Sequence, residues 1–267
     1  MFTAYWEMQF NPFSKPDSAK HAFESEDFKQ ASARLKHLRD IKGLGLFTGL
    51  PGSGKTYALK KFAESLSPSL YKIFYLPLST ITNLEFFRAV ALGLGIVPPY
   101  KKIDLFNAIQ DRMLSLSKDK RVTTVILLDE GQYLNTKILN DLKILLNFDM
   151  DSECHAVIAI FGLPILAATL SMQAHEALAQ RILISYAFNG LSKDELASYL
   201  DSRLSACGVN GNIFPQPALE ALWGCSGGSP RLINSIAEKC LIIGAQRCAK
   251  AIDTDIVMLA NNETALI

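Results

Sequence analysis

The sequence predicts an α/β protein with a mainly parallel sheet, followed by a small all-helical region. Five short and almost purely apolar runs occur before residue 190, as expected of strands that are buried on both faces of a sheet. Amphipathic stretches with helical spacing separate the runs, and alternation of strands with helices is typical of a parallel sheet. After Gly190 the strand signals stop and only helical patterns follow.

The elements can be assigned in chain order. Residues 1–25 are expected to be irregular, because Pro12 and Pro16 interrupt an aromatic stretch. Apolar residues at helical spacing then predict a helix over Glu26–Ile41. The apolar runs predict strands at Leu44–Thr48, Tyr71–Leu78, Val122–Leu128, His155–Phe161 and Ile182–Phe188. Further helices are expected at Lys55–Ser65, Leu84–Leu94, Asp104–Leu116, Lys137–Leu146, Lys193–Ala206, Pro217–Trp223, Pro230–Ala245 and Asp253–Leu259.

Length and composition set the scale of the molecule. The chain has 267 residues, of which 49% are hydrophobic, so it can bury a sizeable core in one large α/β domain, or in one core domain with a small satellite. We expect three parts: an N-terminal segment at 1–42, an α/β core at 43–189 and a helical subdomain at 190–267.

Charge and cysteine usage narrow the class of protein. With 27 basic and 26 acidic residues, a strongly basic nucleic-acid binder is excluded, and any such contact needs a local patch or many subunits. Five scattered cysteines without a CxxC pair predict free thiols in a reducing cytosol. The N-terminus lacks a signal-peptide pattern, and Ala156–Leu170, the longest nearly apolar run, is shorter than the roughly 20 residues of a membrane span. A soluble cytoplasmic protein is expected.

A glycine-rich loop carries the strongest chemical signal. GLPGSGKT (Gly49–Thr56) matches G-x-x-x-x-G-K-[ST] at every fixed position, between a predicted strand and a predicted helix. Its glycines let backbone N–H groups face phosphate oxygens, and the helix N-terminus adds partial positive charge. Lys55 is expected to reach the β- and γ-phosphates, and Thr56 to coordinate Mg²⁺. The predicted cofactors are ATP and Mg²⁺, bound by Gly49, Leu50, Pro51, Gly52, Ser53, Gly54, Lys55, Thr56 and Tyr57.

Two acids end a later apolar run, in VILLDE (Val125–Glu130). A buried strand delivers such acids to the carboxyl edge of a parallel sheet, where ligands bind. We expect Asp129 to hold Mg²⁺ and Glu130 to activate the attacking water. Gln132 either relays the state of the γ-phosphate or caps the next helix.

With these motifs in place, the chain resembles an AAA+ ATPase. More narrowly, it is similar to the ExeA-like ATPases and to ATPases that regulate bacterial transposition. The similarity extends over nearly the whole chain. It rests on NPF at Asn11–Phe13, the two nucleotide motifs, GLP at Gly162–Pro164, AQRI at Ala179–Ile182 and SGGSPRLIN at Ser226–Asn234.

The resemblance implies roles for residues outside the two motifs. Arg181 matches an arginine finger that reaches the nucleotide of a neighbouring subunit, with a surface arginine as the alternative. Arg231 matches the arginine of a helical lid at 190–267, and a structural role is again the alternative. Asn11, Pro12 and Phe13 match the segment that lies against the adenine, although Phe13 could equally pack on the core.

One departure from the AAA+ pattern concerns the end of the fourth strand. The polar residue that many relatives place there is missing from Ile158–Leu166, where Leu163 occupies its position. Slow, partner-stimulated hydrolysis is therefore expected, with Gln132 or a backbone group as compensation and ATP acting as an assembly switch.

The resemblance also implies partners. It points to a homo-oligomer, a ring or filament of about six subunits per turn, that binds double-stranded DNA without sequence specificity and recruits a transposase. Lys101, Lys102, Lys118, Lys120 and Arg121 are the candidate DNA contacts, although such clusters are usually solvated. The alternative is a secretion-type ATPase with a membrane partner. It ranks second because its usual membrane segment and cell-wall domain are not seen in the sequence. A helicase or clamp loader lacks supporting motifs.

Overall fold

The computed structural model describes residues 2–14, 23–77, 82–145, 154–209 and 211–264. They form two compact units. The core unit comprises Gln30–Gly49 and Lys55–Phe188, and the helical unit comprises Met1–Lys29, Leu50–Gly54 and Asn189–Ile267. The middle of the predicted phosphate-binding loop therefore packs with the helical unit.

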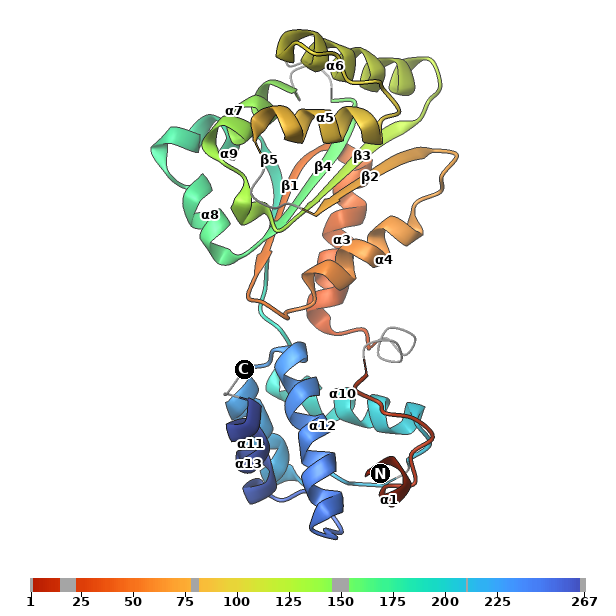
Figure 1. Cartoon of the computed structure of the whole chain (residues 1–267), viewed down its shortest axis with the longest axis vertical. Helices are drawn as coiled ribbons and strands as arrows, with labels where there is room; N and C mark the ends of the chain where they lie inside the picture. Colours follow the sequence, from red (N-terminus) through yellow and green to blue (C-terminus); the bar gives the residue numbers. More distant parts are fainter. Residues whose placement is uncertain (1, 15–22, 78–81, 146–153, 210, 265–267) are drawn as a thin grey trace. The chain divides into compact units, whose positions relative to one another are not determined.

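The core unit is built on a five-stranded parallel sheet of order β2-β3-β4-β1-β5 (Figure 1). The strands are β1 (Gly43–Gly49), β2 (Tyr71–Pro77), β3 (Thr123–Asp129), β4 (Ala156–Gly162) and β5 (Ile182–Phe188). The three inner strands are buried almost throughout, because apolar side chains fill both faces of the sheet. The predicted α/β class with a parallel sheet is confirmed.

Helices cover both faces of this sheet. Even-numbered strand residues such as Leu46, Ile126 and Ile158 belong to a hydrophobic cluster that is formed mainly with four helices. These helices are α5 (Asn83–Gly93), α6 (Lys102–Lys118), α7 (Thr136–Leu145) and α8 (Pro164–Leu170). The helices α3 (Glu26–Ile41) and α4 (Lys55–Ser65) lie on the opposite side. The α3 contact is close, since a Cβ at Gly45 would lie 2.4 Å from Leu38 Cδ2.

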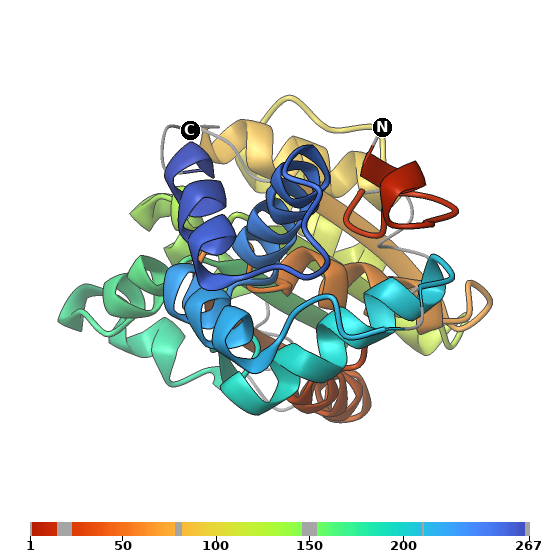
Figure 2. The ribbon, with the colours of Figure 1, turned by 90° about the horizontal axis from the view of Figure 1, so that it is seen from below.

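The helical unit has its own hydrophobic core. Its C-terminal helices are α10 (Lys193–Ala206), α11 (Gln216–Ser226), α12 (Pro230–Gln246) and α13 (Thr254–Thr264). The N-terminal segment joins them: Trp6 donates its indole N–H to the carbonyl of Leu241 at 2.9 Å. Figures 1 and 2 show α1 (Phe2–Tyr5) beside α12. The predicted helical C-terminal region is confirmed.

Some local expectations were wrong. Residues 1–25 were expected to be irregular but contain the short helix α1. Trp6, which follows this helix, contacts α12 through its hydrogen bond to Leu241. The stretch between β4 and β5 carries two unpredicted helices, α8 and α9 (Glu176–Ala179). The helix α8 begins at Pro164, because proline is tolerated in the first turn of a helix. Leu78 and Leu146, the expected ends of a strand and a helix, lie outside the described residues.

No helix among the described residues is both long and apolar enough to cross a membrane.

Candidate nucleotide-binding site

The predicted phosphate-binding loop connects β1 to α4. Gly52 and Gly54 have φ angles of +80° and +99°, a left-handed conformation that only glycine adopts readily. A Cβ added at Gly54 would meet no atom of the described residues within 4 Å. Open space therefore borders the N-terminus of α4, where backbone N–H groups and the helix dipole favour an anion.

The polar side chains of the loop also fit a phosphate ligand. Lys55 is only 7% exposed, and its Nζ donates to the Gly49 carbonyl at 2.8 Å. Ser53 Oγ is buried without a hydrogen-bond partner among the described residues. Buried polar atoms are nearly always paired, so a bound anion would satisfy this hydroxyl. The loop therefore presents donors that suit a phosphate anion, and the triphosphate stays a prediction.

The fold brings Thr56 and Asp129 together from distant positions in the sequence. The Thr56 hydroxyl donates to Asp129 Oδ2 at 2.9 Å, while Asp129 Oδ1 accepts the N–H of Glu130 at 2.9 Å. Asp129 is 4% exposed and ends β3, so it lies at the carboxyl edge of the sheet. Hydroxyl and carboxylate oxygens are the ligands that Mg²⁺ prefers, and these two residues would hold it.

Glu130 follows in an unusual backbone conformation, with a φ of 57°. Its carboxylate is exposed and accepts a hydrogen bond from Gln132 Nε2 at 2.6 Å. A non-glycine residue in this left-handed region costs about 1 kcal/mol or more and often marks a functional site. The Glu130 carboxylate is therefore accessible to water, and its role as the base stays a prediction.

Gln132 links Glu130 to the end of β4. Its Oε1 accepts the N–H of Leu163 at 3.1 Å, at the position where a polar side chain was missing from the sequence. The first turn of α7 is capped by another residue, because Asn135 Oδ1 accepts the N–H of Ile138. The relay of the γ-phosphate state by Gln132 stays a prediction. Gln132 therefore bridges two strand ends.

Tyr75 was not predicted as a site residue, but in the structure its hydroxyl lies beside Asp129. The Tyr75 hydroxyl lies 3.4 Å from Asp129 Oδ2. Burial, and then the charge of Asp129, raise the pKa of Tyr75 above its usual value. No local sequence pattern indicated Tyr75, because its contact with Asp129 depends on the pairing of β2 with β3.

Arg231 lies against the middle of the loop within the helical unit. A Cβ at Gly52 would be 2.6 Å from Arg231 Cβ and 2.9 Å from Ser229 Oγ. Ser229 Oγ also donates to the Pro51 carbonyl at 3.4 Å. Arg231 itself is exposed in the first turn of α12. Its side chain starts at the loop and is free to reach solvent or an anion.

Arg181 occupies a different place. It follows α9, and its guanidinium donates to the carbonyl of Lys143 at 3.0 Å in the last turn of α7. A cation is favourable at a helix C-terminus, so this contact already gives Arg181 a structural role. The finger role stays a prediction.

The NPF segment packs within the helical unit. Phe13 is 5% exposed in its hydrophobic core, and Asn11 Nδ2 donates to Glu238 Oε1 at 2.6 Å. Pro12 is also buried. Core packing, one of the two alternatives for Phe13, is what the structure shows, while contact with adenine stays a prediction.

The candidate DNA contacts lie at opposite ends of α6. Lys101 and Lys102 stand at its start and Lys118, Lys120 and Arg121 at its end. A 17-residue helix separates its ends by about 25 Å. Lys102 also forms an ion pair with Asp141 at 2.5 Å. These cations do not form one continuous patch.

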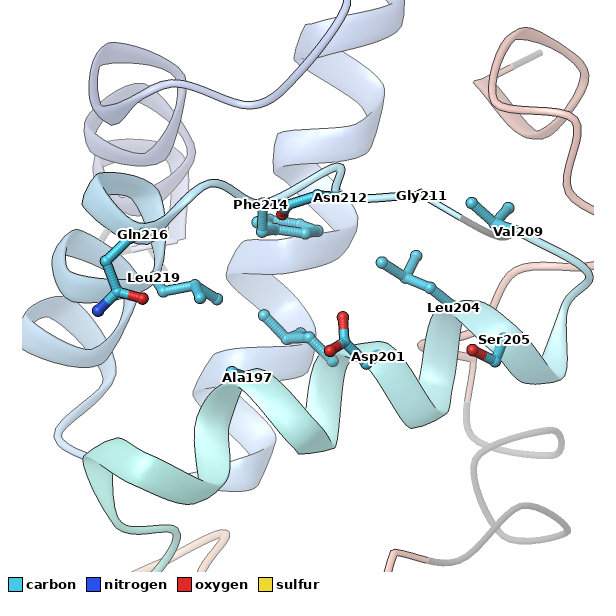
Figure 3. Close-up of a pocket in the computed structure, with 11 residues that line it drawn as sticks. Ala197, Asp201, Leu204, Ser205, Val209, Gly211, Asn212, Phe214, Gln216 and Leu219 are labelled. Atoms are coloured by element: carbon cyan, nitrogen blue, oxygen red, sulfur yellow. The ribbon is translucent and has the colours of Figure 1, made fainter.

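A separate cavity of about 590 Å³ lies in the helical unit between α10 and the segment leading into α11. Figure 3 shows Asp201 and Leu204 of α10 opposite Phe214 and Leu219. None of the predicted site residues lines this cavity.

The class of protein follows from a match to a known protein family. Residues 38–170 match the family described as "AAA domain". This region holds the glycine-rich loop and the acids of β3. The chain therefore contains an AAA domain with the P-loop ATPase fold.

One relative is General secretion pathway protein A of Aeromonas hydrophila. It is 32% identical over 97% of this chain and 48% of its own length. This chain thus spans about half the length of the curated relative that it matches.

Solved structures share the fold at low identity. Cdc6p of Pyrobaculum aerophilum matches with a TM-score of 0.61 and 17% identity over 94% of this chain and 68% of its own. Aeropyrum pernix ORC2, solved as ADPNP–ADP complexes, gives 0.60 and 14% over 89% and 66%. Aeropyrum pernix ORC1 in complex with DNA gives 0.60 and 16% over 94% and 68%. At these identities the likeness concerns the fold alone.

Proposed function

We propose that the chain is an ATP-hydrolysing, nucleotide-switched oligomer that serves the general secretion pathway. The single observation behind hydrolysis is the meeting of Thr56, Asp129 and Glu130 beside the glycine-rich loop. Bound Mg·ATP supplies a phosphoanhydride whose developing charge the cation stabilises. Lys55 and the loop N–H groups bind the phosphates, Thr56 and Asp129 hold the cation, and Glu130 accepts a proton from the attacking water.

The secretion role rests on the relative. The identity of 32% to General secretion pathway protein A extends over nearly all of this chain. This likeness supports a secretion-type ATPase better than a regulator of transposition. The five cysteines are free thiols, which supports a cytoplasmic location for this domain. We infer that a membrane protein of the secretion apparatus is the partner, and that ATP controls the contact.

Deletion of the gene in its own host tests the secretion role. We expect secreted proteins to disappear from the culture medium, measured by mass spectrometry, because the apparatus loses its ATP-driven component. Wild-type protein should restore them, while the Lys55→Ala variant, expressed to the same level, should not. An unchanged set of secreted proteins in the deletion strain would reject this role.

A second candidate is the ATP-dependent DNA-binding regulator of a transposase. The exposed cations at both ends of α6 are the observation in its favour, since repeated subunits could align them along a duplex. If secretion is the function, a fluorescent 30-base-pair duplex should show no ATP-dependent binding at micromolar protein in 50 mM salt. Tight binding that needs ATP, weakens with salt and is lost in Lys120→Glu would favour the regulator.

The proposed finger role of Arg181 is tested in trans. We expect Arg181→Ala to bind ATP normally but to lose at least about 100-fold in turnover, since an arginine finger contributes 10³–10⁵ in the strongest cases. Arg181→Ala keeps a complete nucleotide site, and Lys55→Ala keeps the finger. Mixing the two inactive variants should therefore restore part of the activity.

The mixing experiment also separates catalysis from folding. Thermal melting of Arg181→Ala reports the loss of the contact with Lys143. Equal turnover of Arg181→Ala and wild type at high protein concentration would refute the finger. Failure of the mixture to regain activity, with both variants folded, would refute action in trans.

A further inference from the structure

Tyr75 and Asp129 project from the same face of the sheet. Strands β2 and β3 pair in parallel, with Tyr75 level with Leu127 and Pro77 level with Asp129. Residues two apart on a strand point to one face, so Tyr75 stands one step behind Asp129 on the neighbouring strand. The offset along the strand is about 7 Å, a gap that a long side chain is needed to cross.

The phenol crosses this offset and ends at a buried carboxylate. Its hydroxyl lies 3.4 Å from Asp129 Oδ2, and the Thr56 hydroxyl donates to the same oxygen at 2.9 Å. Tyr75 is 44% exposed, whereas Asp129 is 4% exposed. A surface tyrosine without a role would direct its hydroxyl to water, yet this one is directed to the carboxylate proposed to hold Mg²⁺.

We propose that Tyr75 is a positioning residue of the Mg²⁺ site. It acts through Asp129, whose Oδ2 it holds together with Thr56 while the N–H of Glu130 holds Oδ1. Three donors from three elements thereby fix both oxygens of the carboxylate before the cation arrives. The inference rests on the proposed nucleotide site and adds to it a residue from a strand that bears no recognised motif.

The distance indicates how much Tyr75 contributes. At 3.4 Å the contact is longer than a usual O–H···O bond of 2.5–3.0 Å, so it is weaker than the bond from Thr56. We therefore expect removal of the Tyr75 hydroxyl to weaken the affinity for Mg²⁺ by about three- to tenfold, which is about 0.7–1.4 kcal/mol.

The test is a titration of a fluorescent ADP analogue into wild type and Tyr75→Phe, with varied Mg²⁺ and in EDTA. Phenylalanine keeps the ring and removes only the hydroxyl. The Mg²⁺ concentration that gives half of the metal-dependent gain in affinity should rise about three- to tenfold, while the affinity in EDTA stays within about twofold of wild type. Tyr71→Phe, at the other end of β2, is the matched control and should behave as wild type.

The outcomes separate this inference from the function on which it rests. A Mg²⁺ titration of Tyr75→Phe that superimposes on wild type overturns the role of Tyr75 and leaves the nucleotide site intact. An equal loss of affinity with Mg²⁺ and in EDTA shows a general packing role and also overturns it. If wild type itself binds no nucleotide, the proposed function fails first.

Discussion

Replacement of Lys55 by alanine is expected to abolish ATP binding. Lys55 is a buried cation at the start of α4. Alanine at this position removes the positive charge that the loop offers to the phosphates. Because charge-assisted hydrogen bonds to phosphate are strong, we expect the dissociation constant to rise by at least about 100-fold, or about 3 kcal/mol. Isothermal titration calorimetry with Mg·ATP measures this directly.

A second lysine of the same helix provides the control. Lys60 lies on α4, and its side chain is 65% exposed and forms a 3.8 Å ion pair with Glu64. Lys60→Ala should bind ATP like wild type, because exposed ion pairs contribute little. Circular dichroism should show both variants folded. Binding by Lys55→Ala within a few-fold of wild type would contradict the phosphate role of the loop.

Replacement of Glu130 by glutamine is expected to trap an ATP-bound oligomer. Glutamine keeps the size of the side chain and its contact with Gln132, but it cannot accept the proton of the attacking water. Removal of a general base costs about 10²–10⁴ in rate, so turnover should fall by at least about 100-fold while ATP still binds. Phosphate release measures turnover, and light scattering with ATP measures assembly.

The contrast between the two substitutions identifies the step that fails. By itself, without an ATP-binding partner subunit, Lys55→Ala should remain unassembled with ATP, whereas Glu130→Gln should assemble and stay assembled. Glu64→Gln, an exposed residue of α4, serves as the control and should hydrolyse ATP normally. Turnover by Glu130→Gln at the wild-type rate would show that another group is the base.

Much of the candidate site was predictable because its chemistry lies in contiguous residues. Gly49–Thr56 contains the glycines, the lysine and the hydroxyl in one stretch, between a strand and a helix that hydrophobic spacing reveals. Asp129 was likewise expected at a strand end, since a run of apolar residues must stop where the sheet meets solvent. The α/β class followed from the same alternation.

Other features depended on which strands and helices meet. The contact of Tyr75 with Asp129 requires β2 beside β3, and the reach of Gln132 to Leu163 requires β3 beside β4. The approach of Arg231 to Gly52 joins positions 179 residues apart (231 minus 52).

The sequence by itself determined the phosphate loop, the acids of β3 and the alternation of strands and helices. Each is encoded by neighbouring residues through backbone conformation and hydrophobic period. Only the tertiary structure decided the order of the strands, the third donor on Asp129 and the place of Arg181 at the end of α7. Pairing of distant segments reflects the packing of the whole core, which no local pattern records.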